Sequence, residues 1–200
     1  MAAQSQRCSA TARRIFCLLA VSPVLTLGFH LPFPPWHMAP GGCDKTYARY
    51  EAALRAATAP YQHVLLLGDS MGATASLMFA HLATNVQAFT PQVDLRSSSI
   101  RPGEEDVWFD RLRQRCLDGA AACAGEVVVH TGTWAHDLNQ ARVLPEGGGS
   151  PVRLAVYGVD SHRLALALDR RGRLEGLVRS AVLRAQGLAD TGSLRLSNLF

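Results

Sequence analysis

The stretch that most restricts the fold is HVLLLGDSMGATASLMFAHL, residues 63–82, in which two apolar runs flank a group of small residues. The first run ends at glycine and is apolar on both faces of an extended chain, as is typical of a central strand in a parallel sheet. The second run begins at Met71 and contains no helix breaker before Thr84, so it predicts a buried helix. Ser70 therefore stands at a direct turn from a strand into a helix.

A turn of this kind forces its central residue into a strained backbone conformation, and the chain closes only if the neighbouring residues are small. Gly68 and Gly72 lie two positions on either side of Ser70 and supply that room. The hydroxyl is then held at a helix N-terminus, where backbone N–H groups stabilise an oxyanion. The G-x-S-x-G pattern in this context predicts a nucleophile elbow; a tight turn with an inert serine is the alternative.

Along the rest of the chain, predicted strands alternate with predicted helices. Strands are expected at 86–93, 126–132 and 152–158, and helices at 44–60, 103–117, 135–144 and 162–185, the last divided at Gly172. This alternation predicts an α/β fold with a mostly parallel sheet and helices on both of its faces.

An elbow serine needs a base, and the base needs an orienting acid. Beyond the strand that ends near Gly132, Asp137 follows after five residues, and beyond the strand that ends near Gly158, His162 follows after four. The carboxyl ends of parallel strands share one edge of the sheet, where the elbow also lies. We therefore expect both side chains to lie on loops near Ser70.

Other acidic residues compete for the orienting role. Asp94 follows the predicted strand 86–93 and opens on the same edge of the sheet. Asp160 is only two residues before His162, which leaves it poorly aimed to orient that ring. Asp137 is favoured as the acid, and Asp94 is the alternative.

Other histidines offer different roles. His130 lies inside an apolar strand, which favours a structural role, whereas His136 is adjacent to Asp137 and is expected at the surface or against a substrate. These side chains and His162 have no recognised metal-ligand spacing, so no metal site is expected. No cofactor is expected either.

The segments GDSMGATASLMFAHL, AFTPQVDL, VVVHTG…HDLNQARVL and YGVDSHRLALALDRRGRL together resemble an α/β-hydrolase over roughly residues 36–180. They are most similar to a branch whose hydrolase-like domains often accompany glycan-synthesis or glycosyltransferase modules. The resemblance implies Ser70 as nucleophile, His162 as general base and Asp137 as the residue that orients it. It also implies the Met71 amide as one oxyanion donor.

In such a hydrolase several strands precede the elbow, and the second oxyanion donor comes from an early loop. Only about sixty residues precede the elbow here, so the α/β-hydrolase-like fold is expected to be N-terminally shortened. The loop around Trp36 and His37 is the obvious source of the second donor.

The N-terminal segment, residues 1–35, is basic at first and then apolar over 15–29. This order is typical of a targeting peptide, and early strands are the alternative. Pro23 interrupts the apolar part, which is too short for a membrane span. The hydrolase-like domain is expected at 36–190 and a tail at 191–200.

Composition excludes several classes of protein. The net charge of +4 comes largely from three arginines in residues 1–43, and no basic helix with interleaved aromatic residues indicates nucleic-acid binding. Five cysteines without a C-x-x-C pair indicate neither a zinc nor a redox motif. A cytoplasmic or organellar location is favoured, and secretion is the alternative.

These features predict a serine hydrolase that acts on an ester or thioester through a Ser-His-Asp triad and an acyl-enzyme. Its expected partner is a small-molecule acyl or glycan-linked substrate, with no nucleic-acid or membrane partner. The alternative is a catalytically inactive module of the same fold that binds glycan or a protein.

Overall fold

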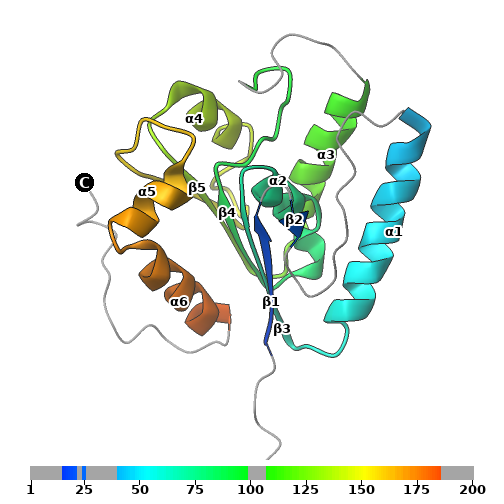
Figure 1. Cartoon of the computed structure of the whole chain (residues 1–200). Coiled ribbons are helices and arrows are strands. Elements are labelled where there is room, and N and C mark those ends of the chain that lie inside the picture. The colour runs from blue at the N-terminus through cyan, green and yellow to red at the C-terminus, as the bar shows by residue number, and fades with distance from the viewer. Residues whose placement is uncertain (1–14, 22–23, 26–39, 99–106, 186–200) are drawn as a thin grey trace, which may run out of the picture.

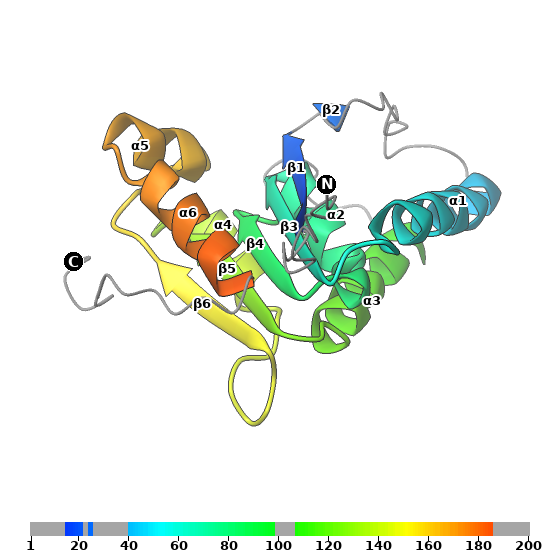
Figure 2. The same cartoon turned by 90° about the horizontal axis from the view of Figure 1, so that it is seen from below.

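The computed structural model describes residues 15–21, 24–25, 40–98 and 107–185 of the chain. Within these residues, six strands form one sheet in the order β2-β1-β3-β4-β5-β6; Figure 1 labels the first five, and Figure 2 shows β6 at the edge beside β5. The strands are β1 (Ile15–Val21), β2 (Val24–Leu25), β3 (His63–Asp69), β4 (Asn85–Phe89), β5 (Glu126–Thr131) and β6 (Val152–Val156). The short β2 is antiparallel to β1, and the other neighbouring strands are parallel.

Helices cover both faces of the sheet, as the alternating pattern predicts. They are α1 (Pro40–Thr58), α2 (Met71–Met78), α3 (Val107–Ala121), α4 (Ala135–Ala141), α5 (Leu164–Arg170) and α6 (Leu174–Ala185), with a short 3-10 helix η1 (Ala80–Leu82). Seen from below, α1, α2 and α3 lie to one side of the strands, and α5 and α6 lie to the other (Figure 2). None of the helices described here is long and apolar enough to cross a membrane.

The side chains of the central strand β3 point alternately to the two faces of the sheet, and each face packs against helices. Leu66 packs with Leu77 of α2 in the core shared with α3. Leu65 packs instead with Ala181 of α6, and Leu67 belongs to the core of α5. The run HVLLLG is apolar throughout because both of its faces are covered.

Several element boundaries differ from the expected ones. Strand β4 ends at Phe89 rather than at residue 93, because Thr90 has a positive φ of 46° and is followed by Pro91, which has no N–H for a sheet. The helix after the elbow ends at Met78 and continues only as η1. Helix α1 begins at Pro40, so Asp44 lies inside it rather than capping it.

The N-terminal apolar segment contributes β1 and β2 to the sheet. Strand β1 pairs with β3 along its whole length, from Ile15 beside His63 to Val21 beside Asp69. The domain boundaries at residues 35 and 190 stay predictions, as does a targeting role for the first residues.

His130 of β5 is buried and structural, as its place in an apolar strand suggests. Its Nδ1 lies 2.8 Å from the Tyr157 hydroxyl and its Nε2 lies 2.9 Å from Gln87 Oε1. The ring stacks on Phe89 with centroids 4.2 Å apart. Burial, helped by nearby arginine charges, lowers the pKa of His130 from 6.5 to about 3.

This buried imidazole is expected to make stability depend on pH. Because the folded state keeps His130 neutral down to about pH 3, whereas the unfolded chain takes up a proton near 6.5, stability falls as pH drops through that window. The loss from this group is on the order of 4 kcal/mol. Urea titrations of the parent and His130→Phe between these pH values should therefore diverge, with the parent losing more stability; parallel curves would contradict a neutral buried ring.

Candidate active site

Ser70 occupies the one-residue junction between β3 and α2, as the motif predicts. Its φ of 53° and ψ of −115° lie where residues with a side chain are strained. The conformation is held from both sides, because the Ser70 N–H donates to the Phe89 carbonyl at 2.8 Å and the Thr74 N–H donates to the Ser70 carbonyl at 3.0 Å.

The first glycine of the motif allows the helix to approach the strand. A Cβ atom at Gly68 would lie 2.3 Å from the carbonyl carbon and oxygen of Gly72, which is far inside contact distance. Because the obstacle is backbone, no side chain could move aside to make room. Gly68 is therefore required by the close packing of the strand against the helix, as the motif predicts.

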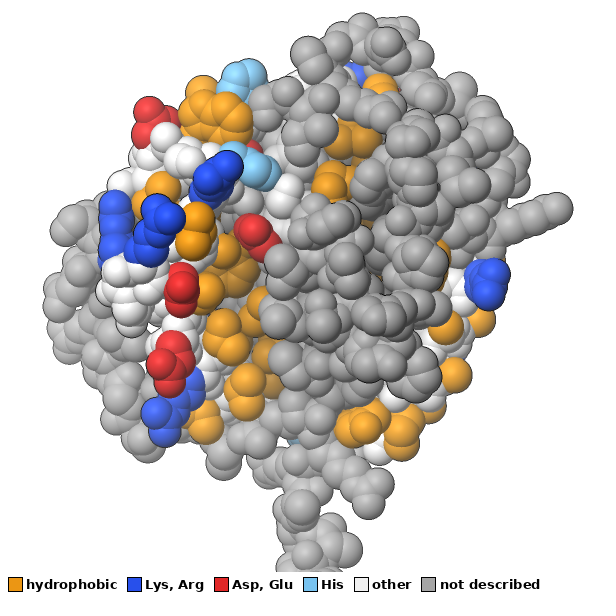
Figure 3. Space-filling model, in the orientation of Figure 1, with side chains coloured by type: hydrophobic (Ala, Val, Ile, Leu, Met, Phe, Trp, Pro, Cys, Tyr) orange, Lys and Arg blue, Asp and Glu red, His pale blue; other side chains and the backbone are white. Residues whose placement is uncertain are grey.

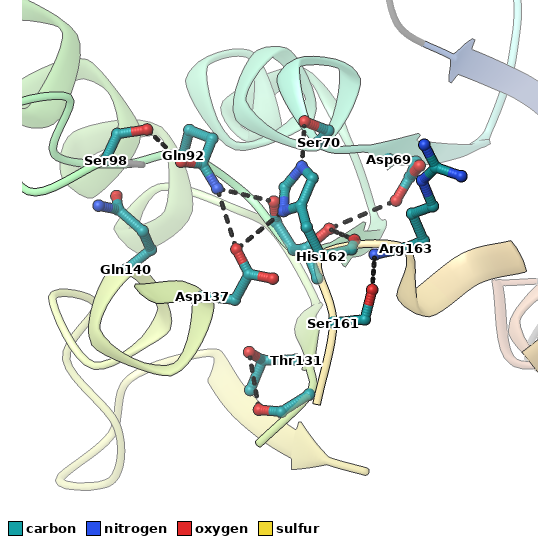
Figure 4. A network of polar contacts seen from close by, with 12 residues as sticks. Asp69, Ser70, Gln92, Ser98, Thr131, Asp137, Gln140, Ser161, His162 and Arg163 are labelled. Carbon is teal, nitrogen blue, oxygen red and sulfur yellow. Dashed lines mark hydrogen bonds and ion pairs between the residues drawn. The ribbon is translucent and has the colours of Figure 1, made fainter. Parts of the chain in front are cut away.

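The structure brings Ser70, His162 and Asp137 together in one chain of hydrogen bonds (Figure 4). Ser70 Oγ lies 2.8 Å from His162 Nε2, and His162 Nδ1 lies 2.8 Å from Asp137 Oδ1. His162 comes from the loop between β6 and α5, as expected. Three segments far apart in the sequence meet at the carboxyl edge of the sheet.

The expected loop position of Asp137 is wrong, since this residue lies in the first turn of α4. The helix begins only four residues after β5, so its N-terminal turn still sits at the sheet edge. An anionic side chain is also favourable near a helix N-terminus. A helical acid therefore reaches the histidine as well as a loop acid would.

The turn before Asp137 and the turn before His162 pack directly against each other. The Thr133 N–H donates to the Val159 carbonyl at 2.9 Å. A Cβ atom at Gly132 would lie 2.1 Å from that same carbonyl oxygen, so only glycine permits this approach. The contact fixes the spacing between the turn that leads to Asp137 and the turn that leads to His162.

His162 and Asp137 differ in their exposure to solvent. The Asp137 side chain is 0% exposed, whereas the His162 side chain is 30% exposed and can be reached from solvent. Histidine side chains are visible on the surface near α4 and α5 (Figure 3). The hydrogen bond to Asp137 raises the pKa of His162 above its ordinary 6.5, against the opposing effect of burial.

Asp69, directly before Ser70, is a second carboxyl near the histidine. Burial raises its pKa above the ordinary 3.8. Thr90 Oγ1 lies 3.4 Å from Asp69 Oδ1 and 3.4 Å from the His162 carbonyl, so this threonine joins the elbow to the histidine loop.

Two buried amides brace the same edge, and the sequence pattern does not single them out. Gln92 Nε2 donates to Asp137 Oδ1 at 3.3 Å. Gln140 Oε1 accepts the Val93 and Asp94 N–H groups, both at 2.7 Å, and so ties α4 to the loop after β4. The sequence gives no signal for Gln92, because it lies inside the strand predicted at 86–93, whereas the observed strand ends at Phe89.

The alternative residues lie elsewhere. Asp94 pairs with Arg96 at 3.2 Å and makes no hydrogen bond with His162. Asp160 is exposed. His136 is also exposed and packs on Trp134, with ring centroids 4.8 Å apart.

The predicted oxyanion donors are only partly described. Met71 is the first residue of α2, and a backbone N–H at that position has no partner within its helix. Trp36 and His37, the expected source of the second donor, lie outside the described residues. Within the described part of the chain, no cluster of three or more His, Cys, Asp or Glu side chains could hold a metal ion.

Comparison with known proteins places the fold. No protein-family model and no curated protein matches the sequence. Among solved structures, an acylaminoacyl peptidase in complex with Z-Gly-Gly-Phe-chloromethyl ketone is similar, with 16% identity and a TM-score of 0.50 over 69% of this chain. The uncomplexed acylaminoacyl peptidase of Pyrococcus horikoshii matches at 16% identity and a TM-score of 0.47 over 69% of this chain.

The esterase domain of a Rhodothermus marinus protein is also similar, with 16% identity and a TM-score of 0.39; the match covers 55% of this chain and 57% of that domain. The chain spans about a quarter of the two peptidases, 26% in each case. The protein thus has an α/β-hydrolase-like fold that corresponds to part of larger hydrolases. None of these similar structures supports the glycan-synthesis branch suggested by the sequence.

Proposed function

We propose that this protein is a serine hydrolase that cleaves an ester or thioester through an acyl-enzyme. The observation that carries the proposal is the unbroken chain of hydrogen bonds from Ser70 Oγ through His162 to Asp137, which starts from a strained residue at a helix N-terminus. A serine hydroxyl, an imidazole and a buried carboxylate in this order form a nucleophile with its base and orienter.

In the acylation step, Ser70 Oγ attacks the carbonyl carbon of the substrate while its proton passes to His162 Nε2. The carbonyl oxygen becomes an oxyanion, which the Met71 N–H stabilises at the start of α2. The oxyanion then collapses, the bond to the leaving oxygen or sulfur breaks, and the proton on His162 passes to the leaving group. The product of this step is the acyl ester of Ser70.

In the deacylation step, water attacks the acyl carbonyl and gives a proton to His162 Nε2. The bond to Ser70 Oγ breaks and the same proton returns to that oxygen. Asp137 accepts the Nδ1–H bond throughout, which holds the ring in the tautomer whose Nε2 can take a proton. The substrate we propose is therefore a small acyl compound, either free or linked to a glycan, and the reaction needs no cofactor.

The proposal is tested by labelling the full chain with a fluorophosphonate probe and mapping the adduct by mass spectrometry. We expect a single adduct on Ser70, together with turnover of short p-nitrophenyl acyl esters and acyl thioesters. A folded protein that takes up no probe and turns over no ester would instead be the inactive binding module of the same fold.

The rate of labelling is expected to rise with pH through the titration of His162. Only the neutral imidazole can accept the Ser70 proton, and the bond to Asp137 raises the pKa of the ring above 6.5. The midpoint should therefore lie above 6.5, higher than an unperturbed histidine would give. Second-order labelling rates over about pH 5 to 9 measure it; a flat profile would exclude a catalytic imidazole.

A further inference from the structure

Gln92 and Asp137 form a buried contact that the reaction scheme does not use. Gln92 is 1% exposed, and its Nε2 lies 3.3 Å from Asp137 Oδ1. Within the described residues, two side chains donate to this buried carboxylate, His162 through Nδ1 and Gln92 through Nε2 (Figure 4). A carboxylate removed from water depends on such donors for the stability of its charge.

The other end of the Gln92 amide is held by Ser98, and its orientation follows from the charge of Asp137. Ser98 Oγ lies 2.6 Å from Gln92 Oε1 and donates to it. The opposite orientation of the amide would place its oxygen against the ionised Asp137, which only accepts hydrogen bonds. The carboxylate therefore keeps the N–H₂ group directed at itself, and Ser98 binds the amide oxygen at the other end.

The backbone of Gln92 is tied to the helix that carries the nucleophile. Thr74 Oγ1 accepts the Gln92 N–H at 2.8 Å and donates to the Gln92 carbonyl at 3.1 Å. Thr74 lies one helical turn after Ser70. These hydrogen bonds therefore hold the Gln92 backbone at a fixed position relative to the nucleophile elbow. The contact thus spans the nucleophile segment and the acid segment.

We propose that Gln92 is a positioning residue for the acid of the triad: its amide stabilises the buried Asp137 carboxylate and fixes the oxygen that faces His162, while Ser98 holds the other end of the amide. This inference rests on the proposed hydrolase function. Among the described residues, the Gln92 side chain makes no hydrogen bond with Ser70 or His162, so we expect it to act through Asp137.

Loss of the amide has a predictable direction. The charged groups that face His162 are Asp137 on α4 and Asp69 at the end of β3. If Gln92 no longer donates, less of the negative charge of Asp137 is balanced by the amide. The attraction between Asp137 and the protonated imidazole then grows, so His162 holds its second ring proton more tightly. The titration of His162 then moves to higher pH, and less of the ring is neutral near pH 7.

The first test replaces Gln92 by methionine, which has a similar length and no donor. We expect the imidazole titration of His162, followed by NMR, to move to higher pH. The fluorophosphonate labelling rate near neutral pH should fall about tenfold. An unshifted titration with an unchanged labelling profile would overturn the proposal.

The second test, Gln92→Glu, gives a readout that a purely structural role would not move. While protonated, the introduced carboxyl can donate to Asp137 and accept from Ser98, as the amide does. Burial beside another carboxylate favours this protonated form at lower pH, and ionisation removes the donor. The labelling rate of this variant relative to the parent should therefore fall as pH rises; a ratio independent of pH would count against the proposal.

Gln140→Met is the matched control, because Gln140 is a fully buried amide on the same helix as Asp137 but bonds to the loop after β4. It should lower stability without moving the titration of His162. If Gln92→Met does not fold, Ser98→Ala carries the test, with a smaller shift in the same direction expected. The NMR titration decides the role of Gln92 even if the parent takes up no probe, an outcome that would refute only the hydrolase function.

Discussion

Replacement of Ser70 by alanine is expected to abolish fluorophosphonate labelling and to lower ester turnover on the order of 10⁵-fold or more. The reason is that Ser70 Oγ is the only oxygen of the triad that can form the acyl ester, and His162 Nε2 lies 2.8 Å from it. The fold should survive, since within the described residues the hydroxyl bonds to one side chain, a ring that is 30% exposed and can bond to water instead. Labelling and urea unfolding of the same preparation measure both effects.

Ser70→Gly is the matched variant, because it removes the same hydroxyl and also the Cβ atom. At a φ of 53° and ψ of −115°, a residue with a side chain is strained by about 1 to 3 kcal/mol, and alanine keeps that strain. Glycine removes the strain but adds about 0.5 to 1 kcal/mol of unfolded-chain entropy. Ser70→Gly should thus be inactive yet more stable than Ser70→Ala by about 1 kcal/mol.

Two outcomes would contradict this interpretation of the elbow. Equal labelling of Ser70→Ala and the parent would remove Ser70 as the nucleophile. A lower urea midpoint for the glycine variant than for the alanine variant would show that the junction stores no strain, even though its backbone angles lie outside the usual regions.

The proximity of Ser70, Asp137 and His162 could be predicted from the sequence because each residue follows a strand that the apolar pattern reveals. HVLLLG, EVVVH and VRLAV all form parallel strands with their carboxyl ends on one edge. Once the order of strands is known, the residues just beyond them must gather there. Ser70 and His162 were assigned in this way, and the structure places them in contact.

The residues that support the triad could not be predicted, because their positions depend on backbone geometry that composition does not reveal. Thr90 has a positive φ, which glycine or asparagine would signal but threonine does not. This turn ends β4 four residues before the predicted end and moves Gln92 from a predicted strand into the site. A tertiary contact therefore decides the role of Gln92.

The location of Asp137 is a second feature that the sequence pattern alone does not settle. A helix at residues 135–144 and a loop position for the acid were both expected, and they are incompatible. The structure resolves the conflict because the first turn of a helix that starts beside the sheet edge can carry a side chain to His162. Its position among the first helical residues also gives the carboxylate a favourable helix dipole.

Asp137→Asn is expected to lower kcat/KM and the rate of fluorophosphonate labelling by about 10⁴-fold, with little change in KM. The buried carboxylate accepts the Nδ1–H of His162 at 2.8 Å, which leaves Nε2 free to take the Ser70 proton. An amide N–H₂ in that place would donate to Nδ1 and force the ring proton onto Nε2. The base would then face the nucleophile already protonated.

Asp94→Asn is the matched control, because Asp94 is the other acid that the sequence allows at this edge. Its carboxylate bonds to Arg96 at 3.2 Å, so the change should cost at most about 1 kcal/mol of stability and leave kcat/KM at the parent's level. The opposite result, an active Asp137→Asn and an inactive Asp94→Asn, would move the orienting role to Asp94. Both variants remove one negative charge from the same edge of the sheet, and of the two carboxylates Asp137 is the one that bonds to His162.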